Sequence, residues 1–461
     1  MKFPRRPPPY QALLGQVFQE LSAHPEKMVE LFGHSATADD GHYLHWDELW
    51  YRHAPSERDF LWAAIKSSRQ RQSSSIQALN ATYSLTGPSH AHNFVYTNLS
   101  SIQKRLHEFD RLNVGHILLT ALGNPDAITE YRVRQLIEEA ISSSEIEGAR
   151  PTTRDLAREL VREGRKPTSR DEQMILNNWR AMERVLELHR ARENLSLAHL
   201  LELHRILGEN ALEIDGAEGL LRGIGDAVEI SDAEGNVWYT PPSANGIEAR
   251  ILALLKFANG ESGDEESFLH PVLRAILCHF WLAFEHPFRD GNGRMARALF
   301  YWCMLRQGYE MAEFLSISGP IDRSPKKYYL AFAHAETDEG DLTYFILNQL
   351  DTISAAIDEL LGHLKERALS MKRLEAAVSD FRELNHRQRS LLQHAIRHSG
   401  ASYTIAGHAR SHEVHYITAQ KDLADLVERG FLDSTQDGQK KRFFVTPDSK
   451  RRLTGSTKRR R

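Results

Sequence analysis

The sequence predicts a mainly α-helical protein with only small β-hairpins. Apolar residues recur at helical spacing in several segments, for example at Leu197, Leu200, Leu203 and Leu207. Strand-like alternation of polar and apolar residues is scarce by comparison. The 461 residues correspond to about two to four domains of ordinary size, so one helical core is not expected to account for the whole chain.

Composition and charge exclude several classes of protein. Lys and Arg number 58 against 62 Asp and Glu, a net charge of −4, so no global basic field attracts nucleic acid. Two cysteines, Cys278 and Cys303, exclude a disulfide scaffold and a four-thiolate zinc site, and we expect both to be core thiols. The N-terminal run MKFPRRPPPY lacks the apolar core of a signal peptide, and the most apolar stretch is far shorter than the roughly 18 residues of a membrane span. We therefore expect a cytoplasmic protein with no membrane partner.

Composition along the chain predicts five parts. Residues 1–100 form an N-terminal helical region with a polar join at residues 67–75. Residues 101–365 form a core that carries nearly all of the interpretable motifs, and residues 366–383 form a helical connector rich in Glu, Lys, Leu and Ala. Residues 384–447 form a separate small module, and residues 448–461 form a basic tail with no acidic residue after Asp448.

The pattern of residues 384–447 is typical of a winged helix. Two segments, 391–396 and 417–427, have helical spacing, and the second ends at Gly430 as a helix C-cap does. Two apolar runs then flank the polar turn Gln436-Asp437-Gly438, which predicts a hairpin that carries Lys440, Lys441 and Arg442. This layout favours either a DNA-binding surface or a protein-interaction module with a solvated tail, and the pattern leaves both open.

The run HPFRDGNGRMAR, residues 286–297, carries the most chemical information. Pro287 interrupts a strongly helical segment, so His286 is expected where that helix ends. Gly291 and Gly293, on either side of Asn292, leave backbone N–H groups free to turn toward an anion.

The next helix is expected to begin at about Arg294, with Arg294 and Arg297 in its first turn. Arginines there oppose the helix dipole, a cost that a bound polyphosphate would offset. A histidine beside such an anion site can act as a general base, and Asp290 is a suitable Mg²⁺ ligand beside phosphates. Together these residues indicate phosphoryl or nucleotidyl transfer. A P-loop is excluded because its lysine is absent, and a calcium loop because Arg294 takes a ligand position.

At every fixed position this run resembles the signature of the Fic family, H-x-F-x-[DE]-G-N-G-R-x-x-R. The resemblance extends upstream to His270-Pro271 and to Tyr239–Pro242. It implies a helical Fic core with a small β-hairpin flap, and transfer of AMP from ATP to a Ser, Thr or Tyr hydroxyl of a protein with release of pyrophosphate. It also implies a role for each motif residue: His286 deprotonates the hydroxyl, Asp290 holds Mg²⁺, Gly291, Asn292 and Gly293 line the anion hole, and Arg294 and Arg297 bind the β- and γ-phosphates.

A second motif lies in the run SSSEIEG, residues 142–148. The helix-forming residues before it predict a helix over 129–148 with Gly148 as its C-cap, and Ser143 and Glu147 then share one face. Taken alone, carboxylates at a helix end are ordinary surface residues. The run also resembles the inhibitory motif of the family, [ST]-x-x-x-E-[GN], which implies that Glu147 pairs with Arg297 and excludes the γ-phosphate.

A third feature is a predicted hairpin over residues 227–240. Alternating residues flank the polar stretch DAEGN at 232–236, which is a good hairpin loop. In the family such a flap clamps the target by strand addition, which reads main chain more than side chains. The candidate docking residues are Val228, Glu229, Ile230, Val237, Trp238 and Tyr239.

These features lead to a functional hypothesis with alternatives. We expect a self-inhibited protein adenylyltransferase that uses ATP and Mg²⁺ on a target protein with a hydroxyl side chain, and on itself. The same loop could instead remove AMP or use another nucleotide, or the core could be the nucleotide sensor of a DNA-binding regulator. An intact His286 favours the enzyme, because a sensor needs no base. The resemblance also implies a homodimer. Tyr328 and Tyr329 resemble aromatic residues that flank the nucleotide in the family, and core packing is an equal alternative for both.

Overall fold

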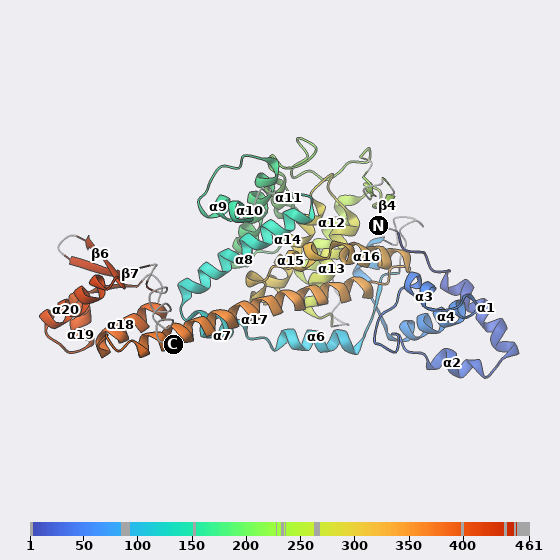
Figure 1. Ribbon diagram of the computed structural model, residues 1–461. Helices are drawn as coiled ribbons and strands as arrows, with labels where there is room; N and C mark the ends of the chain where they lie inside the picture. Colours follow the sequence, from blue (N-terminus) through green and yellow to red (C-terminus); the bar gives the residue numbers. More distant parts are fainter. Residues whose placement is uncertain are drawn as a thin grey trace. The chain divides into compact units, whose positions relative to one another are not determined.

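The computed structural model describes residues 3–83, 93–150, 154–226, 228–231, 235, 237–261, 268–397, 401–437, 440–446 and 449 (Figure 1). These residues fold mainly into α-helices with small antiparallel sheets, so the predicted fold class is confirmed. The chain divides into two compact units. The first contains Met1–Leu112 and Arg134–Ile357, and the second contains Asn113–Val133 and Asp358–Arg461.

The first 112 residues belong to the same unit as the central helices. Their elements are α1 (Tyr10–Ala23), α2 (Lys27–Gly33), α3 (Trp46–Arg52), α4 (Pro55–Gln72), β1 (Ser73–Ser75), α5 (Gln77–Tyr83), β2 (Val95–Thr97) and α6 (Ser100–Asp110). The polar join expected at residues 67–75 is wrong for residues 67–72, which continue α4. The reason is that Arg69 is buried there and donates to Leu44 O at 2.7 Å and to Tyr344 Oη at 2.8 Å. A polar residue with buried partners is compatible with a helix interior.

The centre of the first unit is the helix pair α13 (Pro271–Glu285) and α14 (Asn292–Arg306). Trp281 on α13 and Trp302 on α14 are fully buried, and neighbouring helices pack against the pair (Figure 1). No helix in the described ranges is both long enough and apolar enough to cross a membrane. The elements that complete this unit are α9 (Arg154–Arg162), α10 (Arg170–Ala191), α11 (Leu197–Gly208), β3 (Ile230–Ser231), β4 (Val237–Tyr239), α12 (Ile247–Asn259), η1 (Glu310–Phe314), α15 (Ser318–Arg323) and α16 (Pro325–Thr337).

Two long helices, α8 (Pro125–Ile146) and α17 (Thr343–Asp380), begin in one unit and end in the other. The expected boundary between core and connector, at residues 365 and 366, therefore falls inside one continuous helix. Residues 113–133, which we expected within the core, group with the second unit. Amphipathic spacing continues across such a boundary, so the sequence pattern does not mark it.

The C-terminal part of the second unit combines three helices with a three-stranded sheet. Its elements are α18 (His386–Arg397), β5 (Ser402–Thr404), α19 (Ile405–Ser411), α20 (Tyr416–Glu428), β6 (Leu432–Asp437) and β7 (Lys440–Val445), and α7 (Val114–Leu122) belongs to the same unit. The strand order is β5-β7-β6, with Leu432 opposite Val445 and Ser402 opposite Phe444. Leu391, Leu423 and Phe443 contribute to its core. The sequence pattern missed β5 and α19, which are short, and the basic tail from Lys450 onward lies outside the described residues.

Candidate active site

The loop between α13 and α14 begins at His286, directly after α13 ends. His286 has φ 50°, the left-handed conformation that non-glycine residues rarely adopt. Two hydrogen bonds hold its backbone there: its N–H donates to Leu282 O at 2.9 Å, and Arg222 Nε donates to its carbonyl at 2.7 Å. The surrounding structure therefore fixes the direction in which the imidazole points.

The imidazole of His286 is arranged to accept a proton. Its Nδ1 lies 3.2 Å from Ala283 O, so this nitrogen carries the hydrogen and Nε2 is left as an acceptor. Burial lowers the pKa of His286 to about 4, which keeps the ring neutral at pH 7. A neutral imidazole that lines a cavity can act as a general base.

Helix α14 begins at Asn292, two residues before the expected start. Gly291 is its N-cap, with φ 79°. Both polar atoms of the Asn292 side chain bind Phe288, since Oδ1 accepts from Phe288 N at 2.9 Å and Nδ2 donates to Phe288 O at 2.8 Å. Asn292 therefore closes the loop, and the groups left to face an anion are backbone N–H groups of the first turn.

The two motif arginines are buried at this end of α14. The side chains of Arg294 and Arg297 are only 1% and 2% exposed. Arg294 Nη1 donates to Leu207 O at 3.1 Å. Within the part of the chain that the structure describes, Arg294 Nε and Arg297 Nη1 are buried without a hydrogen-bond partner. Unpaired buried donors are costly, so these N–H groups are suited to bind an acceptor.

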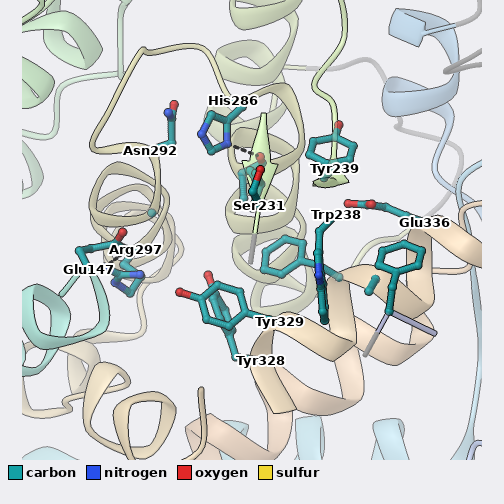
Figure 2. Close-up of a pocket in the computed structure, with 16 residues that line it drawn as sticks. Glu147, Ser231, Trp238, Tyr239, His286, Asn292, Arg297, Tyr328, Tyr329 and Glu336 are labelled. Atoms are coloured by element: carbon teal, nitrogen blue, oxygen red, sulfur yellow. Dashed lines mark hydrogen bonds and ion pairs between the residues drawn. The ribbon is translucent and has the colours of Figure 1, made fainter. Parts of the chain in front are cut away.

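Glu147 and Ser143 both contact Arg297, as Figure 2 shows for Glu147. Arg297 Nη2 donates to Glu147 Oε1 at 2.8 Å and to Ser143 O at 2.9 Å, and its Nε donates to Ser143 Oγ at 2.9 Å. A Cβ on Gly293 would overlap Glu147 Oε1, so only glycine lets the carboxylate come this close to the first turn of α14. Helix α8 ends at Ile146 rather than at residue 148, which places Glu147 in the turn that follows.

One cavity of about 410 Å³ is lined by Glu147, His286, Asn292, Gly293 and Arg297 (Figure 2). Ser143, Asp290, Gly291 and Arg294 are not among its lining residues. From the hairpin, Ile230, Ser231, Trp238 and Tyr239 line it, whereas Val228, Glu229 and Val237 do not. The hairpin pairs Ile230 with Tyr239 and Ser231 with Val237, so its strands are shorter than the expected 227–240. Residues 227, 232–234 and 236 of that range lie outside the described residues. Tyr328 and Tyr329 on α16 line the cavity as well.

Asp290 lies in the loop, two residues before the start of α14. Its Oδ1 accepts from Gly291 N at 2.5 Å, its Oδ2 accepts from Glu213 N at 3.1 Å, and Arg170 Nη2 lies 3.9 Å from Oδ2. Among the described residues no cluster of three His, Cys, Asp or Glu could hold a metal by itself. One carboxylate is nevertheless a suitable donor for Mg²⁺, which takes one or two carboxylates together with phosphate oxygens.

Sequence reasoning missed residues that support the loop from other elements. The ring of His204 on α11 stacks on Phe288 at 3.6 Å, and its Nε2 lies 2.9 Å from Asp290 O. Arg222 holds the backbone of His286, as described above. His204 lies in a leucine-rich helical pattern that gave no chemical signal. Arg289, at a variable motif position, contacts Asp226 at 2.6 Å rather than the cavity, and Cys278 and Cys303 are buried.

Comparison with known proteins agrees with this geometry. Residues 194–304 match the model of the Fic/DOC family. This segment of the chain is therefore similar to the Fic family. Over 165 residues it is 30% identical to the protein adenylyltransferase Fic of Drosophila grimshawi, a match that covers 36% of this chain and 30% of that protein. Over 178 residues it is 28% identical to the protein adenylyltransferase fic-1 of Caenorhabditis elegans, covering 39% and 31%.

The chain spans about 30% of the length of the curated relatives it matches. Among solved structures, a Fic family protein from Desulfovibrio desulfuricans G20 aligns with a TM-score of 0.47 at 20% identity, covering 76% of this chain and 98% of that one. Fic-1 from C. elegans aligns with a TM-score of 0.45 at 18% identity, covering 78% and 89%.

Proposed function

We propose that this chain is a self-inhibited protein adenylyltransferase, which moves AMP from ATP to a Ser, Thr or Tyr hydroxyl of a target protein and of itself. One observation carries the proposal. A neutral His286, with its Nε2 free to accept a proton, lines the same cavity as the first turn of α14 and the buried Arg297. The names of the relatives, protein adenylyltransferases, support the same activity for the Fic domain.

In the proposed reaction His286 Nε2 takes the proton of the incoming hydroxyl. The hydroxyl oxygen forms a bond to the α-phosphorus of ATP. The bond from that phosphorus to the oxygen bridging to the β-phosphate breaks, and pyrophosphate leaves with the electron pair. Backbone N–H groups of the first turn of α14 stabilise the charge that develops on the phosphate oxygens. Arg294 and Arg297 bind the β- and γ-phosphates; Arg294 Nε and Arg297 Nη1 have no hydrogen-bond partner among the described residues.

Asp290 is the residue that would hold Mg²⁺ beside the phosphates. When bound, the ion supplies positive charge that neutralises the polyphosphate. The chain's own contribution is orientation, because the Gly291 and Glu213 N–H groups fix the direction of the Asp290 carboxylate. Removing this carboxylate should therefore raise the Mg²⁺ concentration that gives half of the maximal rate.

The inhibitory part of the proposal rests on Glu147. Its carboxylate lies against Gly293 and binds Arg297, so a negative charge already lies where the γ-phosphate would bind. A triphosphate must displace this carboxylate or bind in an unproductive pose. The flap residues Val228–Ile230 and Val237–Tyr239 would dock an extended target segment through main-chain hydrogen bonds.

Two alternative functions would use the same site. One is the removal of AMP from a modified protein, and the other is the binding of a nucleotide without catalysis. In the removal of AMP, the same base would deprotonate a water molecule. Mass spectrometry of the protein distinguishes addition of AMP from its removal. We expect purified chain incubated with ATP to gain AMP on a hydroxyl side chain, and the His286→Ala variant to gain none. A nucleotide sensor would need no free imidazole nitrogen, so an equal AMP adduct in the variant would contradict the assignment of the base.

A second candidate function belongs to residues 384–447, which we propose form a winged helix that binds duplex DNA. Three helices and the strand order β5-β7-β6 support this fold. The exposed Lys441 and Arg442 on β7 suit phosphate contacts. Tyr416 and Ile417, 55% and 66% exposed at the start of α20, would instead suit a protein partner, which is the competing outcome.

A further inference from the structure

Glu139 is a buried carboxylate on α8 that the proposed chemistry does not use. It is only 1% exposed. Three donors at the start of α15 bind it. Ser316 Oγ and Ser318 N both donate to its Oε2 at 2.9 Å, and Ser318 Oγ donates to its Oε1 at 2.5 Å. A buried carboxylate with several hydrogen bonds holds together the elements that supply them, so Glu139 joins α8 to the residues that begin α15.

The position of Glu139 on α8 relates it to the inhibitory contact. Glu139, Ser143 and Glu147 follow one another at intervals of four residues, and residues four apart lie on the same face of a helix. Helix α8 ends at Ile146, so Glu147 comes directly after it. Ser143 and Glu147 both bind Arg297 of α14. The face of α8 that carries the contacts with Arg297 therefore also carries Glu139, one turn earlier.

The segment that binds Glu139 also binds α14. Tyr301 lies on α14 one turn after Arg297. The Tyr301 hydroxyl donates to Leu315 O at 3.2 Å and accepts from Ile317 N at 2.9 Å. This segment therefore connects α14 with Glu139 of α8. On both helices the connection lies one turn away from the contacts with Arg297, so it fixes how the two helices are placed where the inhibitory contact forms.

We propose that Glu139 is a positioning residue for self-inhibition. Its hydrogen bonds hold α8 at the position along α14 where Glu147 reaches Arg297. The neighbouring glutamate, Glu138, has a different partner, because Arg158 Nε of α9 binds its carboxylate at 2.6 Å. Glu138 therefore holds α8 against α9 and not against α14. This inference rests on the proposed function, because it requires that Glu147 inhibit the transfer of AMP.

The experiment measures how strongly Glu147→Gly activates several parent forms of the full chain. The rate is the initial rate at which label from α-labelled ATP enters protein, and each parent is compared with the same parent carrying Glu147→Gly. The wild-type parent should be activated about tenfold or more. In the Glu139→Ala parent the activation should fall to about threefold or less, because Glu147 is no longer held at Arg297 and its removal changes less. A ratio of rates within one parent cancels any loss of activity that the first substitution causes by itself.

Two control parents separate this role from a general loosening of α8. Glu139→Gln keeps an acceptor oxygen for the Ser318 N–H group and offers an amide donor to the Ser318 hydroxyl, so it should keep the wild-type activation. Glu138→Ala removes a glutamate from the adjacent position and should also keep it. Thermal melts check that each parent is folded. If Glu139→Ala does not fold, Ser316→Ala with Ser318→Ala removes two of the three donors and should lower the activation in the same way.

The outcomes distinguish this inference from the proposed function. If label enters no form of the chain, the proposed transfer of AMP is overturned together with this inference. If label enters protein but Glu147→Gly does not activate the wild-type chain, self-inhibition and the role of Glu139 are both overturned. Equal activation of the wild-type and the folded Glu139→Ala parents overturns the role of Glu139 alone. A Glu138→Ala parent that loses as much activation as Glu139→Ala overturns it as well.

Discussion

Replacing Glu147 with glycine should raise the rate of AMP transfer. The wild-type carboxylate binds Arg297 Nη2 at 2.8 Å, and the arginine side chain is 2% exposed. A hydrogen bond between charged groups contributes about 1.5–3 kcal/mol, which corresponds to about tenfold to a hundredfold in rate when the bond opposes substrate binding. The Glu147 side chain is 28% exposed, so solvent screening favours the lower part of that range.

Arg297 should remain in place after this substitution. Its Nε and Nη2 still donate to Ser143 Oγ and Ser143 O, both at 2.9 Å. The freed guanidinium is then positioned for a phosphate rather than released into solvent. The assay is the initial rate at which label from α-labelled ATP is incorporated into protein, for wild type, Glu147→Gly and Glu147→Gly with Arg297→Ala. The double variant should lose the gain, because Arg297 is itself needed for phosphate binding.

A matched pair of conservative variants controls for a general loosening of the end of α8. Glu147→Gln and Glu145→Gln each remove one negative charge from the same segment, but Glu145 pairs with Arg154 instead of Arg297. Only Glu147→Gln should activate. Equal rates for wild type and Glu147→Gly, or equal activation by the two glutamine variants, would refute self-inhibition through the pair of Glu147 and Arg297.

Three further predictions address the base, its protonation and the C-terminal module. His286→Ala should lower the rate of AMP transfer by at least about a hundredfold, measured by kinetics, while the Kd for ATP, measured by calorimetry, changes only a few-fold. A rise in Kd of about a hundredfold would assign His286 to nucleotide binding instead. Because burial lowers the pKa of His286 to about 4, the rate should stay level from pH 8 to pH 5.5 and fall as the pH approaches 4; a midpoint near 6.5 would contradict the buried, neutral base. The unfolded chain takes up that proton at higher pH than the folded one, so thermal melts should show stability decreasing below about pH 6.5. In a gel-shift assay the full chain should bind duplex DNA at low salt, and its affinity should fall steeply as the salt concentration rises. Changing both Lys441 and Arg442 to alanine should weaken this binding. No gel shift at any salt concentration would favour a protein partner.

The site residues that lie together in one short stretch of the chain could be predicted from the sequence. The run at 286–297 combines a helix end, two glycines and two arginines, and these properties depend on near neighbours only. In the structure, His286, Gly293 and Arg297 line one cavity. The contact between Glu147 and Arg297, which lie 150 residues apart in the chain, was expected from the family resemblance and not from spacing.

The supporting residues could not be found in this way. His204 and Arg222 reach the site from other elements, and their function depends on where the fold places them. The helix over residues 67–72 could not be predicted from the sequence either, because these residues are polar. Buried contacts of Arg69 with Leu44 and Tyr344 keep them helical. Tertiary contacts override local preference in each case.

The most direct test of the central claim compares two labels on the same nucleotide. Purified chain is incubated with Mg²⁺ and either α-labelled or γ-labelled ATP, with Glu147→Gly run in parallel, and labelled protein is then counted. Transfer of AMP predicts that label from the α-position enters protein, that label from the γ-position leaves as pyrophosphate, and that Glu147→Gly increases the first signal. Incorporation of γ-label would show a kinase reaction and contradict the proposed adenylyltransferase.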